Sequence, residues 1–214
     1  MPAPAIKICG ISTAPTLDAV IAARVDYTGL VFFPASPRNV TMTQAATLAA
    51  RNDGRTRLVG LFVDADDATI AAAMQAARLD VLQLHGKETP ERAARLRAQF
   101  GVPVWKALSV ASAADIAASE RYAGAVDLLL FDAKAPKGAA MPGGLGLVFD
   151  WSLLAAYRGA TAWGLAGGLS PENVADAVTR TGAGLVDVSS GVESAPGVKD
   201  EGRIAAFCRA ARAG

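Results

Sequence analysis

Short apolar runs alternate with longer amphipathic stretches along the whole chain. The apolar runs have the length and residue types of β-strands, and the stretches between them have the periodicity of surface helices. The predicted strands lie near residues 5–9, 27–33, 57–63, 80–85, 102–108, 126–132, 161–166 and 184–190, and the predicted helices near 15–24, 43–52, 66–78, 90–99, 112–120, 171–181 and 199–212. This repeated order of strand, loop and helix predicts a parallel sheet with helices outside it.

Eight such units follow one another along 214 residues. That number and length are typical of the α/β fold known as the (β/α)8 TIM barrel, so we predict a single-domain barrel over residues 1–214. The alternative is an open doubly wound sheet, which usually has fewer strands and a glycine-rich fingerprint after the first one. The segment CGISTA, which follows the first predicted strand, has no such fingerprint. The sequence therefore favours the barrel.

Capping residues support the predicted helix starts. Thr89 and Ser170 each precede a proline, a combination typical of an N-cap followed by the first helical residue. Asp150 is expected to cap the helix that follows it. Residues 134–151 form the one long irregular stretch, and a loop of that length in a compact domain is usually functional or disordered.

Polar side chains recur near the carboxyl ends of four predicted strands. They are Lys7 and Cys9 on the first strand, Gln83 and His85 on the fourth, Asp132 on the sixth and Asp187 on the eighth. Successive side chains of a strand alternate between its two faces. If the faces that carry these groups point inward, the groups converge on one mouth of the barrel, where enzymes of this fold have their active sites.

Each of these residues also has a purely structural interpretation. Cys9 could be a buried apolar filler, and His85 could be a structural histidine with satisfied hydrogen bonds. Asp132 could cap the loop after its strand, and Asp187 could belong to a buried network that orients its neighbours. Cys208, on the last predicted helix, is expected to pack in the core.

Two glycine-containing loops near the end of the chain suggest a phosphate site. The loop AGGLSPENV follows the seventh strand and SSGVE follows the eighth. Backbone N–H groups of such turns bind anions, and these two loops hold a phosphate in many barrels. In the loop after the second strand, Arg38 could bind a second anionic group, because a planar guanidinium suits a carboxylate. Its structural interpretation is a solvated surface arginine.

Composition and charge limit the remaining possibilities. The net charge is +1, without a basic run, which argues against a nucleic-acid partner or an anionic membrane surface. The hydrophobic fraction of 52 % is enough for a sizeable core, yet no apolar stretch approaches the ~18 residues of a membrane span. The start of the chain does not resemble a signal peptide, and the two cysteines show no metal-ligand spacing. We expect a soluble cytoplasmic protein that is a monomer or homodimer.

Several motifs in this order resemble the phosphoribosylanthranilate isomerase family of tryptophan biosynthesis. They are KICGI, GLVFFPASPRNV, LVGLFV, LQLHG, LLLFDAK, GGLGLVFDW, AGGLSPENV and VDVSSGVESAPGVKD, which together extend from residue 7 to about residue 200. The resemblance implies an Amadori rearrangement of N-(5-phosphoribosyl)anthranilate to 1-(2-carboxyphenylamino)-1-deoxyribulose 5-phosphate, a small-molecule phosphoribosyl substrate, and no metal or organic cofactor.

The same resemblance implies roles for individual residues. Cys9 matches the general base and Asp132 the general acid, while Arg38 matches the arginine that meets the anthranilate carboxylate. The phosphate site corresponds to Gly167, Gly168, Leu169, Ser189, Ser190 and Gly191. Lys7, Gln83, His85 and Asp187 are expected around the substrate. A thiol acts as a base only as the thiolate, and we expect Lys7, on the same strand face, to lower the pKa of Cys9.

Two other functions are compatible with much of this pattern. The first is the related aminoaldose–ketose isomerase of histidine biosynthesis. Its base position is an aspartate as far as the family resemblance goes, so Cys9 argues against it. The second is a barrel that binds a phosphosugar without catalysis, which would not need both Cys9 and Asp132.

Overall fold

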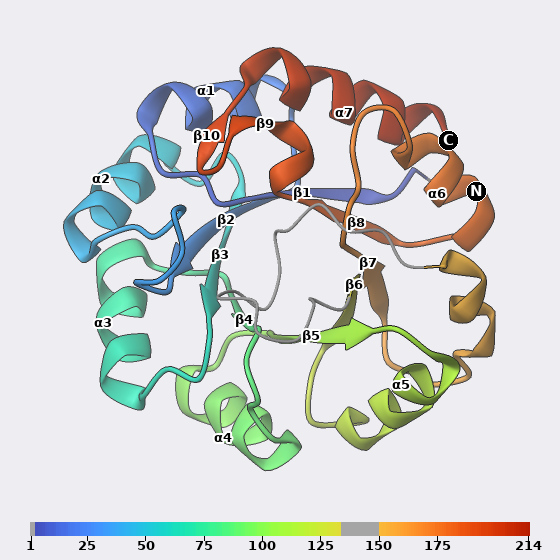
Figure 1. Cartoon of the computed structure of the whole chain (residues 1–214). Helices are drawn as coiled ribbons and strands as arrows, with labels where there is room; N and C mark the ends of the chain where they lie inside the picture. The colour runs from blue at the N-terminus through green and yellow to red at the C-terminus, as the bar shows by residue number, and fades with distance from the viewer. Residues whose placement is uncertain (1–2, 134–149) are drawn as a thin grey trace.

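The computed structural model describes residues 3–133 and 150–214 of the chain. Eight parallel strands close into a barrel in the order of the sequence, and helices form a ring around it (Figure 1). The strands are β1 (Ala5–Cys9), β2 (Tyr27–Phe32), β3 (Arg57–Phe62), β4 (Val81–Leu84), β5 (Val104–Val110), β6 (Leu128–Ala133), β7 (Trp163–Leu165) and β8 (Leu185–Val188). This closed barrel confirms the predicted fold and excludes the open doubly wound sheet.

The helices outside the barrel agree with the predicted ones in place, and differ from them mainly at their ends. They are α1 (Ala14–Ala22), α2 (Met42–Asn52), α3 (Asp67–Ala77), α4 (Pro90–Phe100), α5 (Ala113–Ala117), α6 (Val174–Thr181) and α7 (Glu201–Ala213). The described residues also form three 3-10 helices: η1 (Ala118–Tyr122), which continues α5, η2 (Trp151–Ala156) and η3 (Ser190–Val192). None of the helices within the described ranges has both the length and the hydrophobicity of a membrane-spanning segment.

One of the two predicted threonine or serine caps is correct and the other is wrong. Thr89 caps α4, since its side chain accepts a hydrogen bond from the amide of Arg92. Ser170 does not cap α6, which begins at Val174. The side chain of Asn173 accepts a hydrogen bond from the Ser170 amide and donates one to the Gly168 carbonyl, and these bonds hold the intervening residues in a turn.

The predicted cap at Asp150 is also present, because its side chain accepts a hydrogen bond from the amide of Ser152 at the start of η2. The irregular stretch predicted at 134–151 lies outside the described residues up to residue 149.

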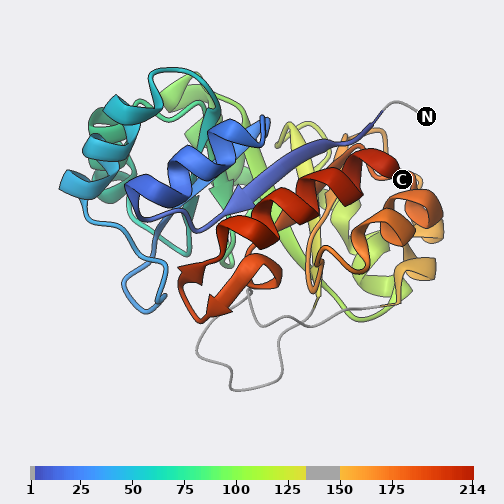
Figure 2. The same cartoon turned by 90° about the horizontal axis from the view of Figure 1, so that it is seen from above.

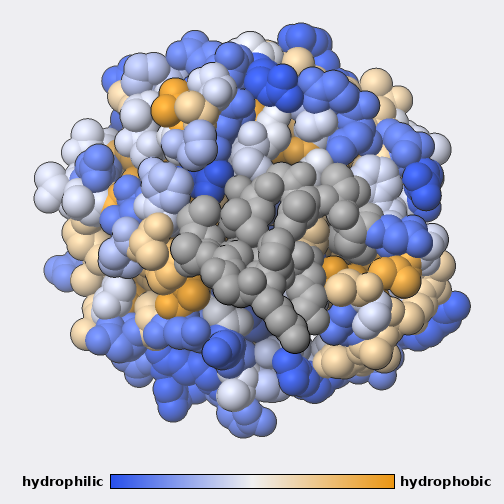
Figure 3. All heavy atoms as spheres, viewed as in Figure 1, coloured by the Kyte–Doolittle hydropathy of each residue, from blue (hydrophilic) through white to orange (hydrophobic). Residues whose placement is uncertain are grey.

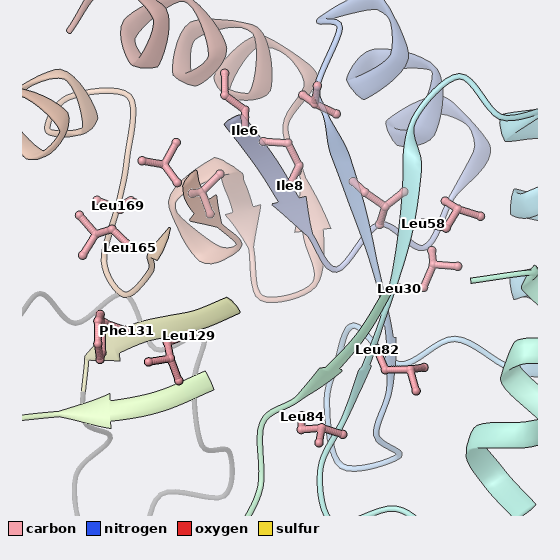
Figure 4. Close-up of a cluster of buried hydrophobic side chains, with 14 of the residues drawn as sticks. Ile6, Ile8, Leu30, Leu58, Leu82, Leu84, Leu129, Phe131, Leu165 and Leu169 are labelled. Atoms are coloured by element: carbon pink, nitrogen blue, oxygen red, sulfur yellow. The ribbon is translucent and has the colours of Figure 1, made fainter. Parts of the chain in front are cut away.

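Alternation along the strands gives the barrel two apolar layers. The outer face of the strands packs against the helices, and residues such as Ile6, Leu30 and Leu82 belong to this large buried cluster (Figure 4). On the other face, the rings of Tyr27 on β2 and Trp105 on β5 lie 4.8 Å apart. These strands are not neighbours, so their contact identifies this face as the interior of the barrel.

Three aspartates at the amino ends of the strands fasten neighbouring strands in pairs. The side chain of Asp26, directly before β2, accepts a hydrogen bond from the amide of Ile6 on β1, and the Asp26 amide donates to the Ile6 carbonyl. Asp80 does the same with Leu58, and Asp127 with Val104. We call these three double hydrogen-bond arrangements the aspartate clasps.

A short antiparallel hairpin follows β8 and was not predicted from the sequence. It consists of β9 (Glu193–Ala195) and β10 (Val198–Lys199). In side view it lies beside the carboxyl end of β1, whereas β1 begins and α7 ends at the opposite end of the molecule (Figure 2). The hairpin therefore stands next to the end of the barrel where the predicted site residues lie.

Candidate active site at the carboxyl ends of the strands

A buried ion pair lies at the centre of the predicted site. The Nζ atom of Lys7 on β1 donates a hydrogen bond of 2.8 Å to Oδ2 of Asp187 on β8. The side chain of Lys7 is 0 % exposed and that of Asp187 is 7 % exposed. A buried charge without an oppositely charged partner is strongly destabilising, so this pair fixes both groups on the inner face of the barrel.

Cys9 is two residues beyond Lys7 on β1, so its side chain lies on the same inner face, and it is buried. Burial raises the pKa of its thiol above the ordinary value of 9.0, while Lys7 acts in the opposite direction. Lys7 thus acts on the Cys9 pKa in the expected direction, but the pKa is raised because desolvation is the larger effect. For Lys7, burial acts to lower the pKa, but Asp187 and Cys9 more than offset it, so its pKa is raised and the ammonium form persists at neutral pH.

A glycine opposite Cys9 makes room for the thiol. Gly29 on β2 is the register partner of Cys9. A Cβ atom at Gly29 would stand 2.9 Å from the Cys9 sulfur and 3.2 Å from Nζ of Lys7. The sequence analysis missed this residue, although a glycine inside a strand pattern is a signal of close approach by a neighbouring group.

Asp132 and His85 meet across the mouth from strands that are not neighbours. Nε2 of His85, just after β4, lies 3.2 Å from Oδ2 of Asp132 on β6. The two atoms are close, but the angles are not those of a hydrogen bond, so Nε2 has no hydrogen-bond partner among the described residues. Asp132 also lies against Gly167, where a Cβ atom would come within 2.6 Å of Oδ1. A side chain at position 167 would therefore displace the carboxylate.

Two further buried polar groups have unused hydrogen-bonding capacity. Gln83 on β4 is 0 % exposed, and neither its amide nitrogen nor its oxygen has a hydrogen-bond partner among the described residues. The same holds for Oδ1 of Asp187. A buried polar atom without a partner is costly, so these atoms are suited to receive a polar ligand or water.

Arg38 is not the solvated surface residue of the structural interpretation. It is buried, and its side chain lies over Gly10, the residue after Cys9, where a Cβ atom would come within 2.7 Å of Cδ of Arg38. Nε and Nη2 of Arg38 donate to the two carboxylate oxygens of Glu193 at 2.7 and 2.8 Å. This bidentate pair fixes the plane of the guanidinium beside the end of β1.

Glu193 and Lys199 were also missed by the sequence analysis. Both lie in the hairpin after β8, and Nζ of Lys199 donates to Oε1 of Glu193 at 2.7 Å. Burial acts to raise the pKa of Glu193, but Arg38 and Lys199 together lower it. Both residues fall in the motif VDVSSGVESAPGVKD, but nothing in their spacing indicates the contact with Arg38, which comes from a loop 155 residues away.

The two predicted phosphate loops touch one another. A Cβ atom at Gly191 would stand 1.8 Å from the carbonyl oxygen of Leu169, so the close approach requires a glycine. Gly167 and Gly168 have φ angles of +83° and +63°, which favour glycine. The amides of Gly168 and Leu169 donate no hydrogen bond within the described part of the chain. They are available to an anion.

The remaining predicted residues of these loops are Ser189 and Ser190, both half-buried at the end of β8. The hydroxyl of Ser189 donates to the carbonyl of Cys9 at 3.1 Å, which ties this loop to β1. Over residues 3–133 and 150–214, no group of three or more His, Cys, Asp or Glu residues is placed to hold a metal ion.

The surface around this end of the barrel is mostly hydrophilic, with small separate hydrophobic areas (Figure 3). Among the described residues, the large hydrophobic side chain that is exposed is Val198, at the tip region of the hairpin.

Comparison with known proteins gives one consistent result. A model of the family described as N-(5'-phosphoribosyl)anthranilate (PRA) isomerase matches residues 6–210. The protein named N-(5'-phosphoribosyl)anthranilate isomerase from Paramagnetospirillum magneticum is 56% identical over 209 residues, which cover 98% of this chain and 97% of that protein.

Solved structures agree. The phosphoribosyl anthranilate isomerase from Thermotoga maritima superimposes with a TM-score of 0.85 at 31% identity, over 98% of each chain. A phosphoribosyl anthranilate isomerase in complex with reduced 1-(o-carboxyphenylamino)-1-deoxyribulose 5-phosphate gives a TM-score of 0.83 at 30% identity, again over 98% of each chain. With the family model matching almost from end to end, this chain belongs to the N-(5'-phosphoribosyl)anthranilate isomerase family.

Proposed function

We propose that this protein is a phosphoribosylanthranilate isomerase, which converts N-(5-phosphoribosyl)anthranilate to 1-(2-carboxyphenylamino)-1-deoxyribulose 5-phosphate by general acid–base catalysis. Family membership supports the reaction. The observation that supports the mechanism is that Cys9 and Asp132 are both buried on the inner face, at the carboxyl ends of their strands. Lys7 lies beside Cys9, and His85 lies beside Asp132.

The first step opens the furanose ring. Asp132 enters in its protonated form and gives its proton to the ring oxygen, while the lone pair of the anthranilate nitrogen forms a C=N bond and the ring C–O bond breaks. The products of this step are an iminium ion and the Asp132 carboxylate. Nε2 of His85, 3.2 Å from Oδ2 of Asp132, is close enough to donate a hydrogen bond to that carboxylate as the charge appears.

The second step moves a proton from carbon. The Cys9 thiolate removes the proton from C2 of the sugar, and the electrons of that C–H bond neutralise the iminium to give an enolamine, which tautomerises to the ketone. The ammonium of Lys7 favours the thiolate electrostatically. Gln83 and Oδ1 of Asp187 have the unpaired hydrogen-bonding atoms needed to hold sugar hydroxyls nearby.

The two ends of the substrate are anionic. In this proposal the phosphate binds to the amides of the loops 167–169 and 189–191, and the anthranilate carboxylate binds to Arg38. Glu193 supports the second assignment because it fixes the guanidinium plane, and a planar guanidinium suits a carboxylate.

The Thermotoga maritima relative is described as dimeric, with monomers generated from it. For this protein we propose a monomer or homodimer, to be measured by sedimentation velocity. We also propose a cytoplasmic location, which is supported by the two cysteines, both free.

The experiment follows the loss of fluorescence of phosphoribosylanthranilate generated in the cuvette. The native protein should accelerate the decay, and Cys9→Ser and Asp132→Asn should each lower the turnover number by at least about 100-fold with the Michaelis constant nearly unchanged. Cys208→Ala is the matched control: it removes the other buried thiol, on α7, and should keep native turnover.

Each outcome has a clear meaning. If the folded native protein binds the substrate without converting it, the isomerase proposal is wrong and the binding barrel is correct. If it converts only the histidine-pathway substrate, the reaction is right and the substrate is wrong. If Cys9→Ser or Asp132→Asn retains native turnover, that residue has no part in the mechanism.

A further inference from the structure

The ammonium group of Lys199 is one of the most completely bonded charges in the structure. Its three donors bind the carbonyl oxygen of Ser189 at 2.9 Å, the hydroxyl of Ser189 at 3.1 Å and Oε1 of Glu193 at 2.7 Å. An ammonium has three N–H donors, so every one is used. The side chain is 1 % exposed, and the group is therefore held in one position.

The hydrogen-bond partners of Lys199 belong to, or form hydrogen bonds with, three parts of the proposed site. Ser189 stands at the head of the second phosphate loop, and its hydroxyl donates to the Cys9 carbonyl at 3.1 Å. Glu193 binds Arg38 through two hydrogen bonds. Lys199 thus connects the strand end that carries the base, the arginine and a phosphate loop, although neither Lys199 nor Glu193 takes part in the proposed proton transfers.

We propose that Lys199 is a positioning residue for this reaction, holding the carbonyl end of β1 through Ser189 and supplying a fixed positive charge that favours the Cys9 thiolate. The inference rests on the proposed function, in which Cys9 is the base. The carboxylate of Glu193 binds both Lys199 and Arg38. It therefore holds these two cations close together near the carboxyl end of β1.

The charged groups that act on Cys9 come from three elements. Lys7 on β1 and Lys199 on β10 lower the pKa of the thiol, and Asp187 on β8 raises it. On β2 the residue opposite Cys9 is Gly29, which has no charge. Burial lowers the pKa of Lys199 itself, although Glu193 and Cys9 oppose this change. Because a positive charge favours the anionic thiolate, removal of Lys199 should move the Cys9 titration to higher pH.

The test titrates Cys9 by the ultraviolet absorbance of its thiolate in the Cys208→Ala background, where it is the sole thiol of the chain. In Lys199→Met the titration should move up by about half to one pH unit, which lowers the thiolate fraction at neutral pH about three- to ten-fold. The rising limb of the kcat/KM profile should move by the same amount. Lys199→Arg, which keeps the charge, should return both toward the native position.

The matched control is Lys106→Met, which removes another buried lysine paired with a glutamate, here Glu88 at 3.0 Å, on the outer side of the sheet. It should lower stability without moving the Cys9 titration. If Lys199→Met fails to fold, Lys199→Gln keeps a donor for Ser189 without the charge and gives the same measurement.

The proposal is overturned if the folded Lys199 variants leave the Cys9 titration and the kcat/KM profile in place, or move them no further than Lys106→Met does. Failure of the proposed function is a different result, because then the native protein itself does not convert phosphoribosylanthranilate.

Discussion

The glycine opposite Cys9, Gly29 on β2, provides the space that the Cys9 side chain occupies. Gly29 has no positive φ to justify a glycine, so its backbone alone would accept alanine. The constraint is the space: its missing Cβ leaves the volume that the Cys9 sulfur and the Lys7 ammonium fill. The pair of inner-face groups on β1 therefore depends on a residue of the neighbouring strand.

We predict that Gly29→Ala folds but lowers kcat by at least about 10-fold. The added methyl has to push the sulfur or Nζ aside, and overpacking of this kind costs about 1–3 kcal/mol of stability. Activity at 25 °C and thermal unfolding measure the two effects separately. Gly184→Ala is the matched control, since a Cβ atom there has no neighbour within 4 Å, and it should be close to native. Native kcat in Gly29→Ala would show that the thiol position is not critical.

At this scale, strand alternation was enough to place Lys7 and Cys9 on one face, because the period of a strand is fixed by its geometry. It was not enough to identify what Arg38 or Cys9 touches. Arg38 binds Glu193, and the Cys9 carbonyl is connected to Lys199 through Ser189. Glu193 and Lys199 lie in a hairpin that has no alternating apolar pattern of its own. The effect of Lys7 on the Cys9 pKa could be predicted, but the larger opposing effect of desolvation could not, because burial depth cannot be read from a sequence.

At the scale of elements, the barrel is assembled from pairs of strands held at their amino ends. The aspartate clasps join β1 to β2, β3 to β4 and β5 to β6. Each clasp uses the amide and the carboxylate of one aspartate to bind the two backbone groups of one residue on the preceding strand. They lie at the opposite end of the strands from the proposed site, where residues of such barrels serve stability rather than catalysis.

We predict that Asp80→Ala lowers the free energy of unfolding by about 1–2 kcal/mol and leaves kcat unchanged. The variant removes the acceptor for the Leu58 amide, and a backbone donor without its partner is destabilising. Urea denaturation gives the stability. Asp176→Ala, which removes an exposed aspartate paired with Arg180 on α6, is the control and should change it by less than about 0.5 kcal/mol. An Asp80→Ala protein as stable as the control would contradict a stabilising role for the clasps.

Most elements could be predicted because apolar periodicity and capping residues mark them, as at Thr89. The start of α6 could not, because Asn173 bonds to Ser170 and Gly168 and so competes with the helix that the Ser–Pro pair suggests. Short polar side chains offer such local alternatives to helical hydrogen bonds. The hairpin β9–β10 was missed because its strands are only three and two residues long.

For the whole molecule, the decisive contact is the one between β1 and β8, because it closes the barrel. Four register pairs join these strands, and the pair Lys7–Asp187 is one of them. The side chains of that pair form the buried ion pair of 2.8 Å. Closure of the fold and placement of the proposed base next to its charged neighbours are therefore the same structural event.

We predict that Asp187→Asn destabilises the protein by about 3 kcal/mol or more, because it leaves the buried Lys7 charge without its counter-ion. The double variant Lys7→Met with Asp187→Leu removes both charges and should recover most of this stability while remaining inactive. Denaturant unfolding and the fluorescence assay measure the two properties. If Asp187→Asn were as stable as the native protein, the ion pair would contribute nothing to closure.

The distance between the partners of this ion pair along the chain has a consequence for synthesis. Lys7 and Asp187 are 180 residues apart. At about 5–20 residues per second, a ribosome needs roughly 9–36 s to make the chain between them. Throughout that interval β1 has no partner on one edge, and its lysine has no counter-ion. A nascent chain halted before Asp187 should therefore be inactive however much of the barrel has formed.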